Sequence, residues 1–313
     1  KRSDTGGSDS YYTVLNNSGT MTFNGGTVKN KSGLEPPAWS GSSLVCNGPS
    51  QPATLIINDG DFSQANFIAI KNDEYGTLTI NGGTIHSATQ AVQNWCDATI
   101  NGGNLTGDVT TWTYLSTNGT TKITDGDING DIQATKLTYN GQAASNKPVV
   151  TISGTPTITG AISVGSQIFN QDGSFVSNNN DAVVTITGGT FSSNVSDYVP
   201  TNYECADNDD GTYTVSKLDD KLVVKPGTDG SATLEGDFGT GGTIEDSTGN
   251  SNIENNNVTV DMTTTGGSND SATLNITEST AQSLGDASSL TVKTNAGTVT
   301  LDSTALDKVS KTE

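Results

Sequence analysis

Gly76-Thr-Leu-Thr-Ile-Asn-Gly-Gly-Thr-Ile85 is one copy of a motif that recurs between residues 19 and 191. Gly19-Thr-Met-Thr-Phe-Asn-Gly-Gly-Thr-Val28 has the same pattern, and shorter or degenerate copies begin at Ala53, Ala98, Thr121, Val149 and Val183. Each copy joins a short alternating apolar run, which is typical of a β-strand, to a glycine turn. The motif therefore predicts an all-β fold built from repeats.

The spacing of the turns indicates how the repeats are arranged. Steps of 22, 20 and 24 residues separate Gly60, Gly82, Gly102 and Gly126. Such steps suit one coil of a β-solenoid, in which each strand pairs with strands of the coils before and after it. Wider steps, as from Gly154 to Gly188, are expected to hold loops inserted in a coil.

Two columns of polar side chains follow from this register. Stacked amides can hydrogen-bond from coil to coil, as in the Asn ladders of stacked β-structures. The turn column is predicted to contain Asn24, Asp59, Asn81, Asn101 and Asp125. The second column is predicted to contain Asn47, Asn72 and Asn94.

The same register predicts that the cysteines are free thiols. Cys46 and Cys96 fall about two coils apart, at different positions relative to their ladder Asn residues. Because coils lie about 4.8 Å apart, a disulfide between them would be too long. Cys205 leaves an odd number, and the three have no metal-ligand spacing.

The sequence after about residue 217 has a different pattern. Strands are predicted at residues 221–224, 257–262, 272–276 and 290–293, with one short helix after Thr277 and another after Asp302. The predicted domains are therefore 1–217 and 218–313. The second is expected to be cut short at Glu313, and the absence of a signal pattern at Lys1 suggests a mature or trimmed chain.

Charge limits the classes of partner. The 313 residues include 34 Asp and Glu against 14 Lys and Arg, which gives a net charge of −20. Such a chain repels phosphate backbones, so we expect no nucleic-acid partner. No apolar run approaches the roughly 18 residues of a membrane span, so no membrane insertion is expected within this segment.

Residues 11–217 resemble the pectate-lyase-like right-handed parallel β-helices of surface proteins from Gram-positive gut bacteria. The resemblance rests on the Asn-Gly-Gly coils and on the closing segments 188–199 and 209–215. The second domain resembles a small domain found beside cell-wall and S-layer repeats. The resemblance implies a secreted or cell-surface, cell-wall-associated protein, and many relatives are adhesins or carbohydrate-binding modules.

The sequence gives little support for the catalytic mechanisms that enzymes of this fold use. Lyases of the group use Arg or Lys as a base, but the sole arginine is Arg2, and Lys71, Lys122 and Lys136 are expected to be exposed strand residues. His86 is the only histidine and is expected to point outward, which excludes a triad. One alternative is a hydrolase or lyase whose carboxylates form a patch able to hold calcium: Asp108, Asp125, Asp127 and Asp131. The other interpretation of these residues is turn chemistry.

Carbohydrate binding has candidate residues of its own, because aromatic rings stack on sugars. Trp112 and Tyr114 alternate, so both point to one face of a strand. Trp95 follows the ladder residue Asn94, and Tyr75 lies one coil earlier. These four rings could form a glycan platform, or they could pack the coils.

The leading hypothesis is a non-catalytic surface protein that mediates adhesion or binds a glycan of a host or cell-wall surface through the β-helix face. No cofactor is expected, with calcium as the alternative. The other candidates are the polysaccharide hydrolase or lyase and a structural spacer of the cell envelope. Ligand identity and oligomeric state do not follow from the residues.

Overall fold

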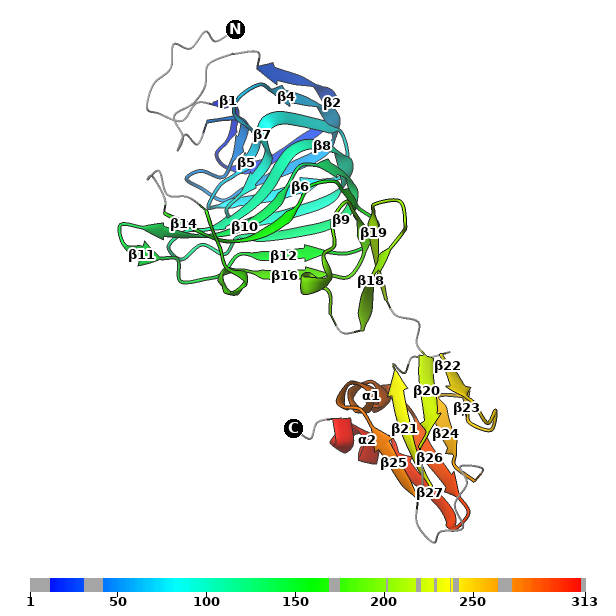
Figure 1. Cartoon of the computed structure of the whole chain (residues 1–313). Helices are drawn as coiled ribbons and strands as arrows, with labels where there is room; N and C mark the ends of the chain where they lie inside the picture. Colours follow the sequence, from blue (N-terminus) through cyan, green and yellow to red (C-terminus); the bar gives the residue numbers. More distant parts are fainter. Residues whose placement is uncertain are drawn as a thin grey trace. The chain divides into compact units, whose positions relative to one another are not determined.

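The structure is a computed structural model that describes residues 12–30, 42–168, 175–200, 202–217, 221–227, 230–236, 238, 242–263 and 272–310. The chain is mostly β, with two short α-helices and an extensive parallel sheet (Figure 1). It divides into two compact units, Lys1–Ser216 and Lys217–Glu313, each with its own hydrophobic core.

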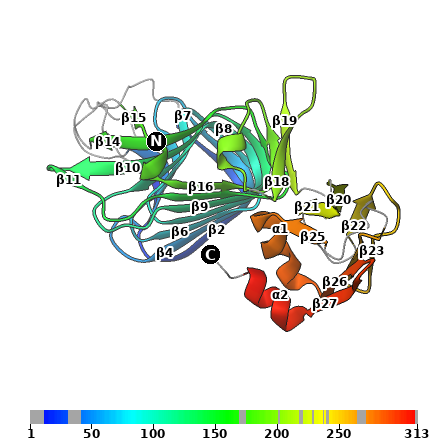
Figure 2. The same cartoon turned by 60° about the horizontal axis from the view of Figure 1, so that its bottom comes forward.

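The first unit consists of repeats that each place one strand in each of three parallel stacks (Figures 1 and 2). The first stack contains β1 (Tyr12–Asn16), β3 (Ser43–Asn47), β5 (Ile68–Asn72), the end of β7 (Thr84–Asn94), the end of β8 (Asp97–Thr113), β10 (Ile132–Tyr139) and β14 (Ile162–Ile168).

The second stack contains the start of β2 (Gly19–Asn30), the start of β4 (Ala53–Gln64), β6 (Gly76–Ile80), the start of β8, the start of β9 (Thr120–Asn129), β12 (Val149–Ile152) and β16 (Val183–Ile186). The third contains the later parts of β2 and β4, the start of β7, the middle of β8, the end of β9, β13 (Thr157–Ile158) and β17 (Gly189–Phe191).

Registered apolar columns form the core between the stacks. In the second stack, one column is buried with no exposed surface at each position: Ile57, Ile80, Ile100, Ile123, Ile152 and Ile186. The third stack has a matching column: Phe62, Ile85, Leu105, Ile128, Ile158 and Phe191. The alternation seen in the sequence therefore places one face of every strand in a shared core.

Shorter elements flank the stacks. β11 (Gln142–Ala143) and β15 (Val176–Ser177) pair antiparallel with β10 and β14. After the short 3-10 helices Asn179–Asp181 and Ser196–Tyr198 come β18 (Tyr203–Asp207) and β19 (Tyr213–Lys217). β19 pairs antiparallel with β17, in the last repeat of the stack.

The second unit has two four-stranded sheets (Figure 1). The first, in the order β22-β20-β21-β25, contains β20 (Lys221–Pro226), β21 (Ser231–Gly236), β22 (Thr243–Asp246) and β25 (Thr273–Ile276). The second contains β23 (Asn252–Glu254), β24 (Asn257–Asp261), β26 (Ser289–Thr294) and β27 (Gly297–Asp302).

Both predicted helices are present and capped as their sequences suggest. α1 (Glu278–Ser283) begins after Thr277, whose hydroxyl accepts a bond from the Thr280 N–H, and continues as a 3-10 turn, Leu284–Asp286. α2 (Ser303–Ser310) follows Asp302, whose carboxylate accepts from the Ala305 N–H at 2.9 Å. These bonds satisfy helix N–H groups that have no partner within the helix.

Candidate functional site

An aromatic and polar cluster lies on the outer side of the first stack. Its residues come from the strands and corners on either side of the buried ladder positions. Asp73 follows Asn72, Trp95 follows Asn94, and Trp112 follows Thr111. We call Trp95, Trp112, Tyr114 and Tyr139 the aromatic cluster. We call Lys71, Asp73, Glu74, Gln90 and Gln93 the polar rim.

The buried ladder holds these corners in place. Asn16, Asn47, Asn72 and Asn94 form a chain of amide bonds of 2.8, 2.8 and 2.9 Å, each amide donating to the next. The last amide donates to the Thr121 hydroxyl at 3.0 Å. Each amide also donates to main-chain carbonyls, so the chain satisfies buried polar groups of successive repeats. The predicted column is confirmed, and the structure adds Asn16 to it.

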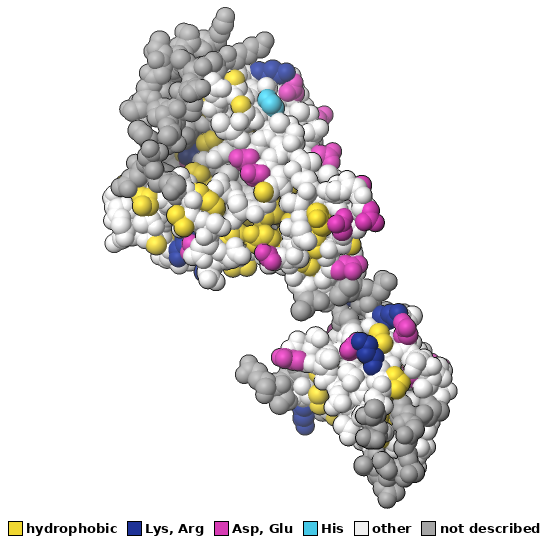
Figure 3. All heavy atoms as spheres, viewed as in Figure 1, with side chains coloured by type: hydrophobic (Ala, Val, Ile, Leu, Met, Phe, Trp, Pro, Cys, Tyr) yellow, Lys and Arg dark blue, Asp and Glu magenta, His cyan; other side chains and the backbone are white. Residues whose placement is uncertain are grey.

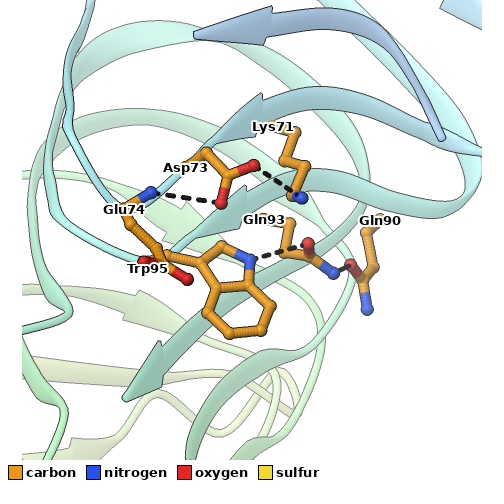
Figure 4. A network of polar contacts seen from close by, with 6 residues as sticks. All are labelled: Lys71, Asp73, Glu74, Gln90, Gln93 and Trp95. Atoms are coloured by element: carbon orange, nitrogen blue, oxygen red, sulfur yellow. Dashed lines mark hydrogen bonds and ion pairs between the residues drawn. The ribbon is translucent and has the colours of Figure 1, made fainter. Parts of the chain in front are cut away.

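Within the polar rim, Lys71 pairs with Asp73 (Figure 4). Its ammonium lies 2.7 Å from the Asp73 carboxylate, and both side chains are largely buried. The same carboxylate accepts a bond from the Glu74 N–H at 3.1 Å. The expectation that Lys71 is an exposed strand residue is therefore wrong: the neighbouring corner brings a carboxylate and a ring over it.

Trp95 links the rim to the aromatic cluster. Its indole N–H donates to Gln93 at 2.8 Å, and the Gln93 amide donates to Gln90 at 2.8 Å (Figure 4). The Lys71 ammonium lies 5.7 Å from the ring centroid, which is within the range of a cation–π contact. Trp95 as a residue is only 5% exposed, so it supports the cluster and does not itself offer a face to a sugar.

The other rings pack edge to face around Trp95. Its ring centroid lies 5.0 Å from that of Trp112 and 5.8 Å from that of Tyr114, and Tyr114 lies 5.2 Å from Tyr139. These three outer rings are half-buried. The Trp112 N–H is buried and has no hydrogen-bond partner among the described residues. Trp95, Trp112 and Tyr114, predicted from three separate sequence positions, thus converge.

Tyr75 is the fourth predicted platform residue, and it is 51% exposed. No ring contact joins it to the aromatic cluster among the described residues. Tyr139 belongs to the cluster and was not predicted, because it lies more than one repeat from Trp112 in the sequence. β10 pairs with β8 so that Thr135 aligns with Trp112. This pairing brings Tyr139, at the end of β10, into contact with Tyr114.

Glu74 is the rim residue whose pKa is shifted from its ordinary value. Burial raises the pKa of its carboxyl, the charge of Asp73 raises that pKa further, and the charge of Lys71 opposes both. Burial likewise raises the pKa of Tyr114, with the charges of Tyr139 and Glu74 adding to it. Because Asp73 neutralises Lys71, the three charged rim residues carry a net charge of about −1 at neutral pH.

The turn column differs from the prediction in two members. Its amide bonds join Asn24, Asn58, Asn81 and Asn101 at 2.7, 2.8 and 3.0 Å, and the Thr124 hydroxyl donates to Asn101 at 2.9 Å. Asp59 and Asp125 align with Asn24 and Asn101 in backbone register but accept bonds from Gly60 and Gly126 instead. A register shift at the turn moves Asn58 into the column, and a carboxylate cannot donate to the next amide.

The four predicted carboxylates do not act as one group. Asp108 accepts from the Asp131 N–H at 3.0 Å, and Asp131 accepts from the Ala161 N–H at 2.8 Å, so this pair caps successive repeats. Asp125 caps a different turn, and Asp127 lies exposed on β9. Among the described residues, no group of three or more His, Cys, Asp or Glu side chains could hold a metal ion. Figure 3 shows acidic side chains spread over the visible face.

The remaining reactive residues are isolated. His86 is exposed, as predicted, and so is Lys122, whereas Lys136 is half-buried. All three cysteines are free, as predicted; Cys46 is fully buried, and burial raises the pKa of its thiol to about 12. Its thiolate is therefore not populated at neutral pH.

No described helix is long and apolar enough to cross a membrane. No protein-family model matches the chain, and comparisons with curated proteins and with solved structures found no match.

Proposed function

We propose that this chain is a non-catalytic secreted or cell-surface protein that binds carbohydrate through the aromatic cluster and the polar rim. The observation that carries the proposal is the convergence of Trp112, Tyr114 and Tyr139, each half-buried, with the carboxylate of Glu74, whose charge acts on Tyr114 and which has no ion pair among the described residues. Rings offer apolar faces to sugar C–H groups, and neighbouring polar side chains bond the hydroxyls.

The first unit is, in this proposal, a right-handed parallel β-helix. Three parallel stacks, in-register apolar columns and two amide columns support it. A right-handed path is the usual one for parallel strands joined by crossovers. The resemblance to surface proteins of Gram-positive gut bacteria supports a cell-surface address and the interpretation of residues 218–313 as a small surface-protein domain.

Geometry favours binding over catalysis. A glycoside hydrolase needs two carboxyl groups facing one sugar bond, one to donate a proton and one to act as base or nucleophile. Asp108, Asp125 and Asp131 each accept a main-chain N–H instead, which fixes them as caps of the repeats. In the rim, Asp73 is held by Lys71, and Glu74 is the charged rim residue that has no ion pair within the part of the chain that the structure describes.

Charge narrows the class of ligand. Uronic-acid and sulfated polysaccharides are anionic. The net charge of −20 and the Glu74 carboxylate would repel them and so disfavour their binding. Neutral glycans, or glycans that bear ammonium groups, fit this surface better. Glu74 and Gln90, at the polar rim, supply polar groups for their hydroxyl, acetamido or ammonium groups.

An array of neutral, anionic and amino polysaccharides tests the proposal. Each is scored both for retained protein and for new reducing or unsaturated ends. Retention without new ends is expected, and Tyr114→Ala and Glu74→Gln should each weaken it about tenfold, a loss of about 1.4 kcal/mol. Tyr213→Ala, a change of the same kind on β19, should leave retention unchanged.

Other outcomes contradict the proposal in different ways. New ends in the wild type would show catalysis and direct attention to the carboxylates. Retention that survives both site variants would place the binding surface elsewhere. Absence of both signals across the array would favour a spacer of the cell envelope.

A further inference from the structure

One ammonium group of this chain is already held between a carboxylate and an aromatic ring. The Lys71 ammonium lies 2.7 Å from the Asp73 carboxylate and 5.7 Å from the centroid of the Trp95 ring. The ion pair and the cation–π contact both favour the charged amine, and Lys71 is only 8% exposed. This part of the polar rim and the aromatic cluster therefore suits a cation.

A second carboxylate lies next to the first in the sequence. Glu74 directly follows Asp73, is half-buried, and has no ion pair within the part of the chain that the structure describes. Its side chain points away from the Lys71 ammonium (Figure 4). Its charge also reaches the outer rings, since burial raises the pKa of Tyr114 and the charges of Tyr139 and Glu74 raise it further. The outer part of the site therefore combines a carboxylate with rings, as the inner part does.

The side chains of two tyrosines meet in this outer part. The ring centroids of Tyr114 and Tyr139 are 5.2 Å apart, with an angle of 66° between the ring planes. Besides burial, a hydrogen bond with the Tyr139 side chain raises the pKa of Tyr114. An ammonium has three N–H donors and no acceptor, whereas carboxylate and phenol oxygens can all accept. The oxygens of Glu74, Tyr114 and Tyr139 are therefore of the kind that an ammonium group needs.

We propose that the glycan bound by this chain carries a free amino group, whose ammonium binds at Glu74 beside the Tyr114 and Tyr139 rings. This inference rests on the proposed carbohydrate binding, since it names the ligand class of the same site. The ammonium donates to the Glu74 carboxylate, and the sugar C–H groups pack on the outer rings. An acetylated amine would offer only one neutral N–H, and hydrogen bonds between charged groups are roughly twice as strong as neutral ones.

The environment of the Glu74 carboxyl favours a cationic ligand over a neutral one. Burial raises the pKa of this carboxyl, the charge of Asp73 raises it further, and the charge of Lys71 lowers it. The ionised carboxylate is therefore less stable here than in water. A bound ammonium offsets that cost, a neutral sugar leaves it in place, and an anionic sugar adds to it.

Calorimetric titration of the full chain with two ligands tests the inference. The probes are a glucosamine oligosaccharide with free, protonated amines and the same oligosaccharide with every amine acetylated, both at physiological ionic strength. The wild type should bind the free-amine form about tenfold more tightly. Glu74→Gln should reduce that ratio to about one, because it weakens only the free-amine form. Glu204→Gln, which removes the same charge from an exposed position on β18, should keep the ratio.

A pH series with the free-amine form adds an independent measurement. Lowering the pH protonates Glu74 while the sugar amine keeps its charge, so the affinity should fall through the raised pKa of this carboxyl. The fall should be much smaller in Glu74→Gln. Lys71 stays charged throughout, and any change that arises from Asp73 would persist in that variant.

The outcomes separate this inference from the proposed function. Equal affinity for the two forms, or tighter binding of the acetylated form, would overturn the inference and leave carbohydrate binding standing. A ratio that Glu204→Gln lowers as much as Glu74→Gln does would assign the preference to the overall acidity of the chain and would also overturn it. Absence of binding to both forms would overturn the inference too, whereas the proposed function fails only if no glycan of the array is retained.

Discussion

Two amide columns differ in this protein mainly in burial, and that difference sets what a single side chain contributes. Asn72 has no exposed surface; its amide accepts from Asn47 and donates to Asn94 and to two carbonyls. Asn81 makes the corresponding bonds in the turn column, but it is exposed. Water can replace a lost partner only at the exposed position.

Asn72→Leu is therefore expected to lower the free energy of unfolding by about 2–4 kcal/mol, because it leaves Asn47, Asn94 and nearby carbonyls unpaired in the core. Asn81→Ala should cost less than about 1 kcal/mol. Urea unfolding of both variants, followed by circular dichroism, gives the comparison. Equal losses at the two positions would show that burial does not set the contribution of the columns.

The carboxyl of Asp108 is expected to make the stability of the first unit depend on pH. Burial raises the pKa of its carboxyl, the Asp131 N–H bond opposes the shift, and the charge of Asp131 adds to it. A carboxyl whose folded pKa exceeds its unfolded pKa binds more protons when folded, so its ionisation lowers stability as pH rises through that window.

Asp108→Asn should consequently stabilise the first unit at neutral pH relative to the wild type, since the amide oxygen can still accept from Asp131. The gain should shrink as pH falls through the raised pKa, where the wild-type carboxyl becomes protonated. Thermal unfolding of both chains at a series of pH values measures it. A gain that is independent of pH would mean that the charge of Asp108 is not its cause.

At the scale of elements, each repeat passes from the third stack to the first at a corner. At this corner the main chains of successive repeats lie very close together. A Cβ on Gly130 would collide with the Gly107 carbonyl, and a Cβ on Gly160 would collide with the Gly130 carbonyl. These glycines stack in consecutive repeats beside Asp108 and Asp131, whose carboxylates accept N–H bonds from the neighbouring repeat. The corner is therefore a packed column of main chain.

Gly130→Ala should destabilise the first unit by more than about 2 kcal/mol, because the neighbouring backbone has to move away from the new methyl group. Thr157→Ala, on the exposed face of β13, should stay within about 0.5 kcal/mol of the wild type. Chemical denaturation of both variants compares the two. A tolerated alanine at Gly130 would show that the repeats can separate at this corner.

At the scale of the whole molecule, two units with separate cores share one chain. The core of Lys1–Ser216 contains the apolar columns, and that of Lys217–Glu313 contains Leu222, Leu234, Val258 and Leu290. Units of this kind usually fold and unfold independently.

Calorimetry of the full chain should accordingly show two transitions, and residues 217–313 produced alone should reproduce one of them. Asn72→Leu should lower the temperature of only the other transition. A single transition that Asn72→Leu shifts as a whole would indicate that the two units unfold together.

Local sequence by itself determined the repeat spacing, the Asn47-Asn72-Asn94 column and both helix starts, because each follows from periodicity or from a cap within a few residues. Tertiary structure decided the contacts that depend on the turns and on neighbouring strands. A register shift put Asn58 in place of Asp59, neighbouring strands buried Trp95 and Lys71, and Tyr139 joined the rings from another strand. Such contacts join residues in different repeats, up to 34 positions apart for Asn24 and Asn58. At that distance one extra residue at a turn changes the neighbour, and no local pattern records it.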